Sequence, residues 1–263
     1  MQELKKYCNE FSIELTDRQL EQFQMYYELL IEWNEKVNLT AITEYDEVLK
    51  KHFLDSLALV KGNEIDIIRK VCIENQRIKL LDIGTGAGFP AIPLKIVYPQ
   101  LIVVMLDSLN KRINFLNEVI QKLGLSDITA LHGRAEDFAK CVAGNHTKKS
   151  DGIEDVSDAI CYREGFDIVV SRAVANLSTL SEYCLPYVKK GGVFVAYKSE
   201  ELVREQEKAE HAVDILGGKI EKVFDFTLPC TDYHRNLCVI RKVKPTPKKY
   251  PRKAGTPAKE PLV

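Results

Sequence analysis

A glycine-rich turn at residues 80–90, which read L-L-D-I-G-T-G-A-G-F-P, constrains the fold of this chain more than any other feature. A mainly apolar run at residues 80–83 is broken by Gly84, Gly86 and Gly88, and a helical pattern follows. Glycines at such a break allow a tight turn that brings the backbone close to a ligand. The stretch therefore predicts a strand, a cofactor-binding loop and a helix start, in that order.

The spacing of the glycines indicates which cofactor the loop binds. A dinucleotide fingerprint, G-x-G-x-x-G, would need glycine at position 89, where this chain has Phe89. Glycines at i, i+2 and i+4 resemble motif I of the S-adenosylmethionine-dependent methyltransferases. Because S-adenosylmethionine has no pyrophosphate, its loop need not bare a helix N-terminus to an anion. We expect S-adenosylmethionine as the cofactor, and an NAD-dependent reductase on a similar sheet is the alternative that a cofactor titration would decide.

From residue 79 onward the chain alternates predicted strands with predicted helices. This alternation predicts an α/β fold with a doubly wound, mostly parallel sheet of the Rossmann-like, class I methyltransferase type. The last two strands lack a helix between them and should pair antiparallel. The seven strands are expected at 79–83, 102–106, 128–131, 167–170, 193–197, 220–226 and 236–241, and the helices at 90–98, 110–123, 177–188 and 200–216.

Three regions are expected along the chain. Residues 1–77 predict a helical extension packed on the core, in which Thr16 and Gln19 form a capping box before an apolar helix face. Residues 78–243 form the methyltransferase domain, with a polar loop insertion at 144–163. Residues 244–263 form a basic tail rich in proline and lysine.

Bulk composition excludes several classes of protein. The 263 residues are 45% hydrophobic and 29% charged, which is ordinary for a globular chain. No apolar run approaches the ~18 residues of a membrane span, and the N-terminus lacks an apolar signal-peptide core, so we expect a cytoplasmic location. We also expect a monomer. Seven scattered cysteines without a C-x-x-C pair predict reduced thiols and no metal site.

Charge is unevenly distributed between the tail and the rest of the chain. Residues 241–263 contain eight lysines and arginines and one acid, Glu260. The whole chain has a net charge of −1, so a tail of +7 is joined to a body of −8. Such a tail should be extended or disordered in isolation. Clustered cations bind RNA phosphates through counterion release, which favours RNA over a merely solvated run of charge.

In open α/β sheets, ligands bind beyond the carboxyl ends of the strands. There Asp107, about 20 residues after the glycines, is placed to accept ribose hydroxyls. Residues 134–137 (R-A-E-D) could read the adenine edge or merely cap a helix. Arg172 directly follows an apolar strand, and a guanidinium is costly to bury unpaired, so it should meet a carboxylate, the cofactor or the substrate. Lys198 follows the fifth strand and is either a solvated strand end or a site residue.

Two further patterns bear on the reaction. His52 and Asp55 lie three positions apart on one helix face, where a structural or substrate-pocket contact is favoured over a metal site. Residues 171–173 (S-R-A) are neither the Asn/Asp-Pro-Pro-aromatic turn of many exocyclic-amine methyltransferases nor a cysteine nucleophile. Such a site suits an acceptor with a free lone pair, such as guanine N7, and catalysis mainly by positioning.

Six motifs occur in order along the chain: N-L-T-A-I at 38–42, H-F-L-D-S-L at 52–57, L-D-I-G-T-G-A-G-F-P at 81–90, L-D-S-L-N-K-R at 106–112, R-A-E-D-F at 134–138 and S-R-A-V-A at 171–175. Together they resemble the bacterial small-subunit ribosomal RNA guanine-N7 methyltransferases, the glucose-inhibited division protein B family. The resemblance covers nearly the whole chain and departs from the family mainly at the long 144–163 segment.

The resemblance implies methylation of N7 of one guanine in the 530 loop of 16S rRNA, with S-adenosylmethionine as the methyl donor and the small ribosomal subunit or its RNA as the partner. The expected catalytic residue is Arg172. The expected cofactor-binding residues are Gly84, Gly86, Phe89, Asp107, Ala135, Glu136 and Arg172, and the expected RNA-binding residues are Lys198, Lys248, Lys249, Arg252 and Lys253.

Other functions are compatible with parts of this pattern. A methyltransferase acting on another RNA site would share every cofactor motif. An RNA-binding protein without activity is disfavoured by the glycine loop together with Asp107 and Arg172. A small-molecule methyltransferase is disfavoured by the basic tail.

Overall fold

The computed structural model describes residues 1–139, 162–172, 175–198 and 202–262 of the chain. Most of the predicted loop insertion, residues 144–161, and Ala173 of the S-R-A motif lie outside the described residues.

The centre of the molecule is a seven-stranded sheet with the order β3-β2-β1-β4-β5-β7-β6. Its first five strands are parallel, and β7 runs antiparallel to both β5 and β6, which confirms the predicted fold class and the antiparallel end. The chain reverses its order of strand addition between β1 and β4, and this reversal opens a crevice at the carboxyl ends of the parallel strands. The strands are β1 (Lys79–Ile83), β2 (Ile102–Asp107), β3 (Ile128–His132), β4 (Phe166–Arg172), β5 (Val188–Lys198), β6 (Gly218–Thr227) and β7 (His234–Lys242).

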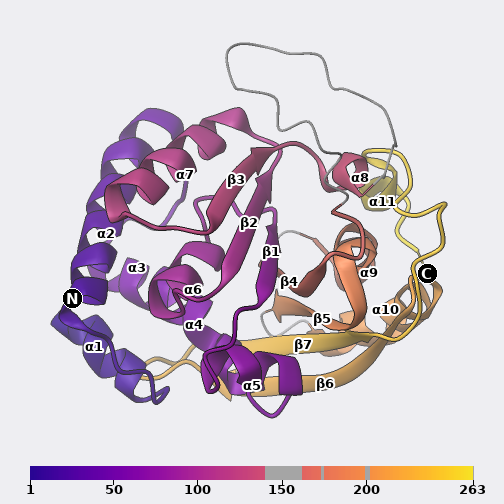
Figure 1. Ribbon diagram of the computed structural model, residues 1–263, viewed down its shortest axis with the longest axis horizontal. Coiled ribbons are helices and arrows are strands. Elements are labelled where there is room, and N and C mark those ends of the chain that lie inside the picture. Colours follow the sequence, from indigo (N-terminus) through magenta and orange to yellow (C-terminus); the bar gives the residue numbers. More distant parts are fainter. Residues whose placement is uncertain (140–161, 173–174, 199–201, 263) are drawn as a thin grey trace.

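Helices cover both faces of the sheet (Figure 1). Successive strand residues point to opposite faces: Leu80 belongs to one apolar core and Leu81 to the other. The first face packs against α2 (Asp17–Val37), α6 (Ala91–Val97) and α7 (Asn110–Leu123); the second packs against α8 (Ala135–Phe138), α9 (Leu177–Cys184) and α10 (Leu202–Ile215).

The N-terminal residues add helices to the first face. After α1 (Gln2–Asn9), α2 begins at the predicted capping box, in which Thr16 and Gln19 each accept from the other's backbone N–H. Residues 45–62 then follow one helical path through α3 (Tyr45–Val48), a π-helical turn (Leu49–Leu54), α4 (Asp55–Leu57) and a 3₁₀ turn (Ala58–Gly62), and α5 (Asp66–Cys72) leads to the sheet. This path carries His52 and Asp55 to the crevice.

The C-terminal tail is ordered against the second face, which corrects the expectation of an extended or disordered segment. Tyr250, Pro251 and Pro257 are buried, and the segment ends in a short helix, α11 (Thr256–Lys259), beside α8 and α9 (Figure 1). Polar anchors that leave no periodic signal hold it: the Arg163 guanidinium donates to the carbonyls of residues 139, 246, 247 and 250. The low apolar content of the tail therefore does not prevent it from packing on the domain.

Candidate active site

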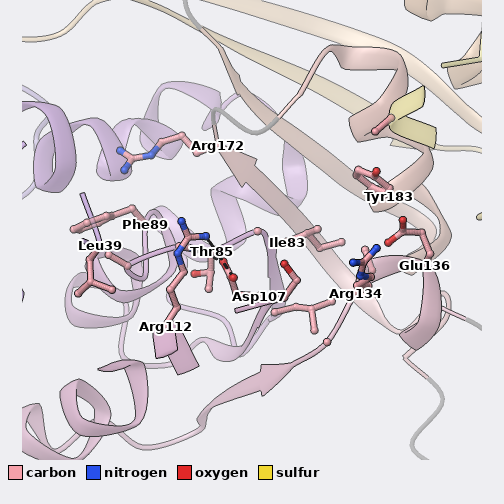
Figure 2. Close-up of a pocket in the computed structure, with 18 of the residues that line it drawn as sticks. Leu39, Ile83, Thr85, Phe89, Asp107, Arg112, Arg134, Glu136, Arg172 and Tyr183 are labelled. Carbon is pink, nitrogen blue, oxygen red and sulfur yellow. Dashed lines mark hydrogen bonds and ion pairs between the residues drawn. The ribbon is translucent and has the colours of Figure 1, made fainter. Parts of the chain in front are cut away.

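A cavity of about 690 Å³ lies at the carboxyl ends of β1, β2, β3 and β4. Every residue predicted to bind cofactor lines it: Gly84, Gly86, Phe89, Asp107, Ala135, Glu136 and Arg172. The cavity is elongated (Figure 2): Leu39 and Phe89 lie at one end, Glu136 and Tyr183 at the other, and Asp107 between them. We refer to these as the Phe89 end and the Glu136 end.

The glycine loop presents its backbone to the cavity because three residues adopt positive φ. Gly84, Gly86 and Gly88 have φ values of 72°, 62° and 95°, a region that side chains disfavour. A Cβ on Gly88 would also lie 2.6 Å from the Ile92 side chain. Glycine is thus required at position 88 both for the turn and for close packing of α6 behind it.

Asp82 stabilises the glycine loop by hydrogen bonds on the side away from the cavity. Its Oδ2 accepts from the Thr85 hydroxyl at 2.7 Å and from the Ala91 N–H at 3.3 Å. Among the described residues, none supplies a hydrogen-bond partner for its buried Oδ1. Burial raises the pKa of Asp82 to about 7, since desolvation disfavours the charged form.

Asp107 occupies the middle of the cavity wall, where the ribose was predicted to bind. Its Oδ2 accepts from the Gly86 N–H and its Oδ1 from the Leu109 N–H, both at 2.9 Å. Arg112, which sequence reasoning missed, lies 3.1 Å from Oδ2. Any ligand hydroxyl that bound to this carboxylate would share it with Arg112. Position 112, the last residue of the L-D-S-L-N-K-R motif, was the available signal.

The Phe89 end is built from aromatic stacking and one guanidinium. The His52 and Phe89 rings stack at 4.4 Å, 14° from parallel, and the Arg172 guanidinium lies 5.2 Å from the Phe89 ring centre. Tyr26 packs on the same phenylalanine and donates to the Ala87 carbonyl. Because all four groups restrain one another, this end of the cavity is preorganised.

Arg172 is held by three partners from the helical path at 45–62. It donates to the Lys51 carbonyl at 3.1 Å and to Asp55 at 3.2 Å, and it lies 3.3 Å from Nδ1 of His52. The spacing of His52 and Asp55 predicts that they lie near one another, and Arg172 contacts both. This is the carboxylate contact that the sequence offered as one role for Arg172.

His52 is neutral in this environment. Burial, and then the Arg172 charge, lower its pKa to about 3. Its Nε2 lies 2.8 Å from the Thr40 hydroxyl, which ties the N-L-T-A-I motif to the cavity. Leu39 and Thr40 both line the wall, so residues that could have been helix-cap positions belong to the site.

The Glu136 end contains an element that sequence reasoning assigned elsewhere. Ala135 and Glu136 begin α8, and the Tyr187 hydroxyl donates to the Ala135 carbonyl. Glu136 is 5% exposed, and its Oε1 accepts from the Gly255 N–H at 2.9 Å. Gly255 and Ala258 of the C-terminal tail line the cavity beside it.

The predicted RNA-binding residues divide into two groups. Lys198 is only 10% exposed at its side chain, pairs with Glu205 at 2.7 Å and donates to the Ala175 carbonyl. Arg252 pairs with the buried Glu182 at 2.6 Å. Both of these residues are paired with carboxylates of the protein, whereas the other three are exposed: Lys248, Lys249 and Lys253.

Ser171, the neighbour of Arg172, has a structural contact. Its hydroxyl is buried and donates to the Ile83 carbonyl at 2.8 Å. This bond links β4 to the end of β1, where the two strands diverge around the crevice.

The described part of the chain contains neither a metal site nor a membrane-spanning helix. Within residues 1–139, 162–172, 175–198 and 202–262, no group of three His, Cys, Asp or Glu side chains is arranged to hold a metal ion. No helix in these ranges combines the length and apolar character that a membrane crossing requires.

Comparisons with known proteins agree over nearly the full length. A family model described as rRNA small subunit methyltransferase G matches residues 19–237. The chain is 55% identical over 251 residues to the ribosomal RNA small subunit methyltransferase G of Lachnoclostridium phytofermentans, covering 95% of this chain and 93% of that protein. It is 46% identical over 263 residues to the protein of the same name from Alkaliphilus metalliredigens, covering 98% and 97%. It is 48% identical over 260 residues to that of Staphylococcus aureus, covering 99% and 97%.

Proposed function

The chain belongs to the rRNA small subunit methyltransferase G family, and on that premise we propose that it methylates N7 of a guanine in the 530 loop of 16S rRNA with S-adenosylmethionine as methyl donor. One observation carries the proposal: the motifs shared with the family converge on a single cavity at the switch point of the sheet. An alternative reductase function would need glycine at position 89, where the Phe89 ring instead forms a cavity wall.

The lining of the cavity fits S-adenosylmethionine along its length. The loop of Gly84 and Gly86 offers backbone without side-chain bulk, and the Asp107 carboxylate lies where ribose hydroxyls need an acceptor. Ala135 and Glu136 at the far end supply backbone and carboxylate groups for the adenine edge. We assign the methionine portion to the Phe89 end. When bound, the cofactor supplies an electrophilic methyl group.

The protein residues at the Phe89 end act by orientation. Guanine N7 carries a lone pair and no proton, so the acceptor needs no general base. His52, neutral because of its burial, neither competes with Arg172 for anionic groups nor adds a second positive charge beside it. Arg172, fixed over Phe89, can position the methionine carboxylate or the acceptor base, and such positioning contributes through effective molarity.

RNA contact is proposed for the exposed lysines of the tail. Lys248, Lys249 and Lys253 all face solvent on the segment that leads to the Glu136 end of the cavity. Phosphate contacts of this kind position RNA without reading its sequence. The site of modification must then be selected by groups nearer to Arg172.

We further propose that the enzyme works as a cytoplasmic monomer. A ribosomal RNA substrate supports a cytoplasmic location. A monomer is supported by the exposed large apolar side chains of the described residues, which belong to four separate segments of the chain: Met25, Ile73, Leu109 and Val243.

The decisive experiment uses methyl-labelled S-adenosylmethionine and small subunits from cells that lack this protein. We expect label in 16S rRNA and an N7-methylated guanine in the 530 loop when the modified base is mapped. Label at a different nucleotide would replace the proposed target, and a complete lack of label with intact subunits would contradict the activity. Subunits from cells that contain the protein are the control, since their target is already methylated.

A further inference from the structure

The C-terminal residues 255–258, which we call the C-terminal strap, form part of the cavity wall. Gly255 and Ala258 line the cavity at its Glu136 end, more than 110 positions after Glu136 itself. Figure 1 places α11, which contains most of this strap, directly beside α8. A segment that composition assigned wholly to RNA thus borders the predicted cofactor site.

Three independent contacts hold the strap in place. The Gly255 N–H donates to Glu136 at 2.9 Å, and the Thr179 hydroxyl donates to the Pro257 carbonyl at 3.1 Å. Just upstream, the Arg252 guanidinium donates to both carboxylate oxygens of Glu182, whose side chain is 1% exposed. Charge-assisted, two-pronged pairs of this kind fix orientation as well as position.

The conformation of Gly255 explains why its N–H can reach Glu136. Gly255 has φ of 81° and caps the start of α11. A β-carbon at this φ would be strained, so glycine lets the chain turn toward α8. Because Gly255 has no side chain and Ala258 has only a methyl group, a flat ring could approach this part of the wall closely.

We propose that the C-terminal strap is a wall of the adenosine-binding half of the cofactor site, held against the cavity by Glu136. This inference rests on the proposed function and adds a binding element to it. It also gives Glu136 a second role, because one carboxylate oxygen holds the strap while the other remains available to the ligand. The basic tail would then contact both RNA, through its exposed lysines, and S-adenosylmethionine, through residues 255–258.

A bulky side chain at Ala258 tests the inference. Ala258→Trp should occupy space at the Glu136 end that the adenosine portion needs, and so raise the Kd for S-adenosylmethionine by roughly tenfold or more. The same rise should appear with adenosine, a probe that lacks the methionine portion. Ala254→Trp is the matched control, because Ala254 is also exposed and does not line the cavity.

Titration calorimetry gives the Kd values, and circular dichroism melts show that both variants fold. If Ala258→Trp binds both ligands as tightly as Ala254→Trp does, the inference is overturned. A wild-type protein that binds no S-adenosylmethionine would instead overturn the proposed function.

Amide exchange of the wild-type protein provides a test that needs no variant. The Gly255, Thr256 and Ala258 amides should exchange more slowly when S-adenosylmethionine is added at saturation. Unchanged exchange at all three, with slower exchange in the glycine loop, would show that the cofactor binds without touching the strap.

Discussion

Arg172 and Asp55 lie 117 positions apart in the sequence and form an ion pair of 3.2 Å at the Phe89 end of the cavity. The same carboxylate accepts from Arg235 at 2.9 Å. One almost fully buried acid thus lies between two guanidinium groups and holds one of them over the Phe89 ring. The helical extension therefore contributes directly to the geometry of the site.

Replacing Arg172 tests its proposed role. Arg172→Ala should reduce the initial rate of methyl transfer to small subunits by ~10-fold or more, about 1.4 kcal/mol in transition-state terms. The loss follows because alanine places no guanidinium over Phe89. Arg77→Ala is the control, since Arg77 is exposed and pairs with Asp127 away from the cavity. Equal rates for the two variants would exclude Arg172 from the reaction.

Asp55 is expected to act as a positioning residue through Arg172. Asp55→Asn leaves two guanidinium groups without their shared charge, which should lower the free energy of unfolding by about 3–5 kcal/mol. Methyl transfer should fall at the same time, with kcat affected more than KM for RNA. Urea unfolding and steady-state rates measure the two effects.

The control for this variant is Asp66→Asn. Asp66 pairs with Arg241 at 2.8 Å, but its side chain is 56% exposed, and exposed pairs contribute only about 0–1 kcal/mol. A stability loss at Asp55 no larger than the loss at Asp66 would contradict the structural role of the shared carboxylate.

The stability of the protein should depend on the protonation of Asp82. Burial raises its pKa to about 7, above the ordinary value of about 4 in the unfolded chain. Between these values the folded state holds a proton that the unfolded state has lost, so the free energy of unfolding falls as pH rises and levels off above about pH 7. Asp82→Asn removes this dependence.

Urea unfolding of the wild type and Asp82→Asn from pH 5 to pH 8 measures the effect. We expect the wild type to lose about 2–3 kcal/mol relative to the variant over this range. Parallel curves for the two proteins would show that Asp82 is ionised throughout.

Gly88 should tolerate no side chain. Gly88→Ala places a Cβ 2.6 Å from Ile92 and 2.8 Å from the Tyr26 hydroxyl, at a φ of 95°. Strain and overlap together should destabilise the fold by about 3 kcal/mol or more and weaken cofactor binding. Gly124→Ala is the matched control: Gly124 also has positive φ, but no described atom lies within 4 Å of its added Cβ. Gly124→Ala should lower the free energy of unfolding by only about 1–2 kcal/mol. If Gly88→Ala melts at the same temperature as Gly124→Ala, that result would argue against tight packing behind the loop.

The exposed lysines of the tail should set the salt dependence of RNA binding. Truncation after Val239 would remove the last three residues of β7, so point substitutions are the cleaner test. Changing Lys248, Lys249 and Lys253 together to Ala should weaken RNA binding and flatten the slope of log K against log salt by about 2 units. The Kd for S-adenosylmethionine should stay unchanged, because none of the three lines the cavity.

Filter binding at several salt concentrations gives these slopes. A charge-matched control removes three exposed lysines from other surfaces: Lys6, Lys122 and Lys219. If both triple variants give the same slope, the tail has no special role in RNA contact.

Local sequence signals were sufficient to predict the sheet and the strand-end residues that line the cavity. Apolar runs that alternate with helical patterns indicated the seven strands, because a parallel strand buried on both faces is apolar along most of its length. The glycine loop, Asp107 and Arg172 could be placed because each directly follows a strand, and parallel strands bring such positions to one edge. Residues that follow different strands in the sequence therefore become neighbours in the folded protein.

Only the three-dimensional structure shows which charged groups pair with one another. Arg172 meets Asp55, Lys198 meets Glu205 and Arg252 meets Glu182, and none of these partners is marked by spacing. The packing of the tail was hidden for the same reason, since hydrogen bonds to backbone carbonyls, as made by Arg163, have no sequence period. The sequence therefore specified where the glycine loop turns, while long-range polar contacts determined that the C-terminal residues 255–258 border the Glu136 end of the cavity.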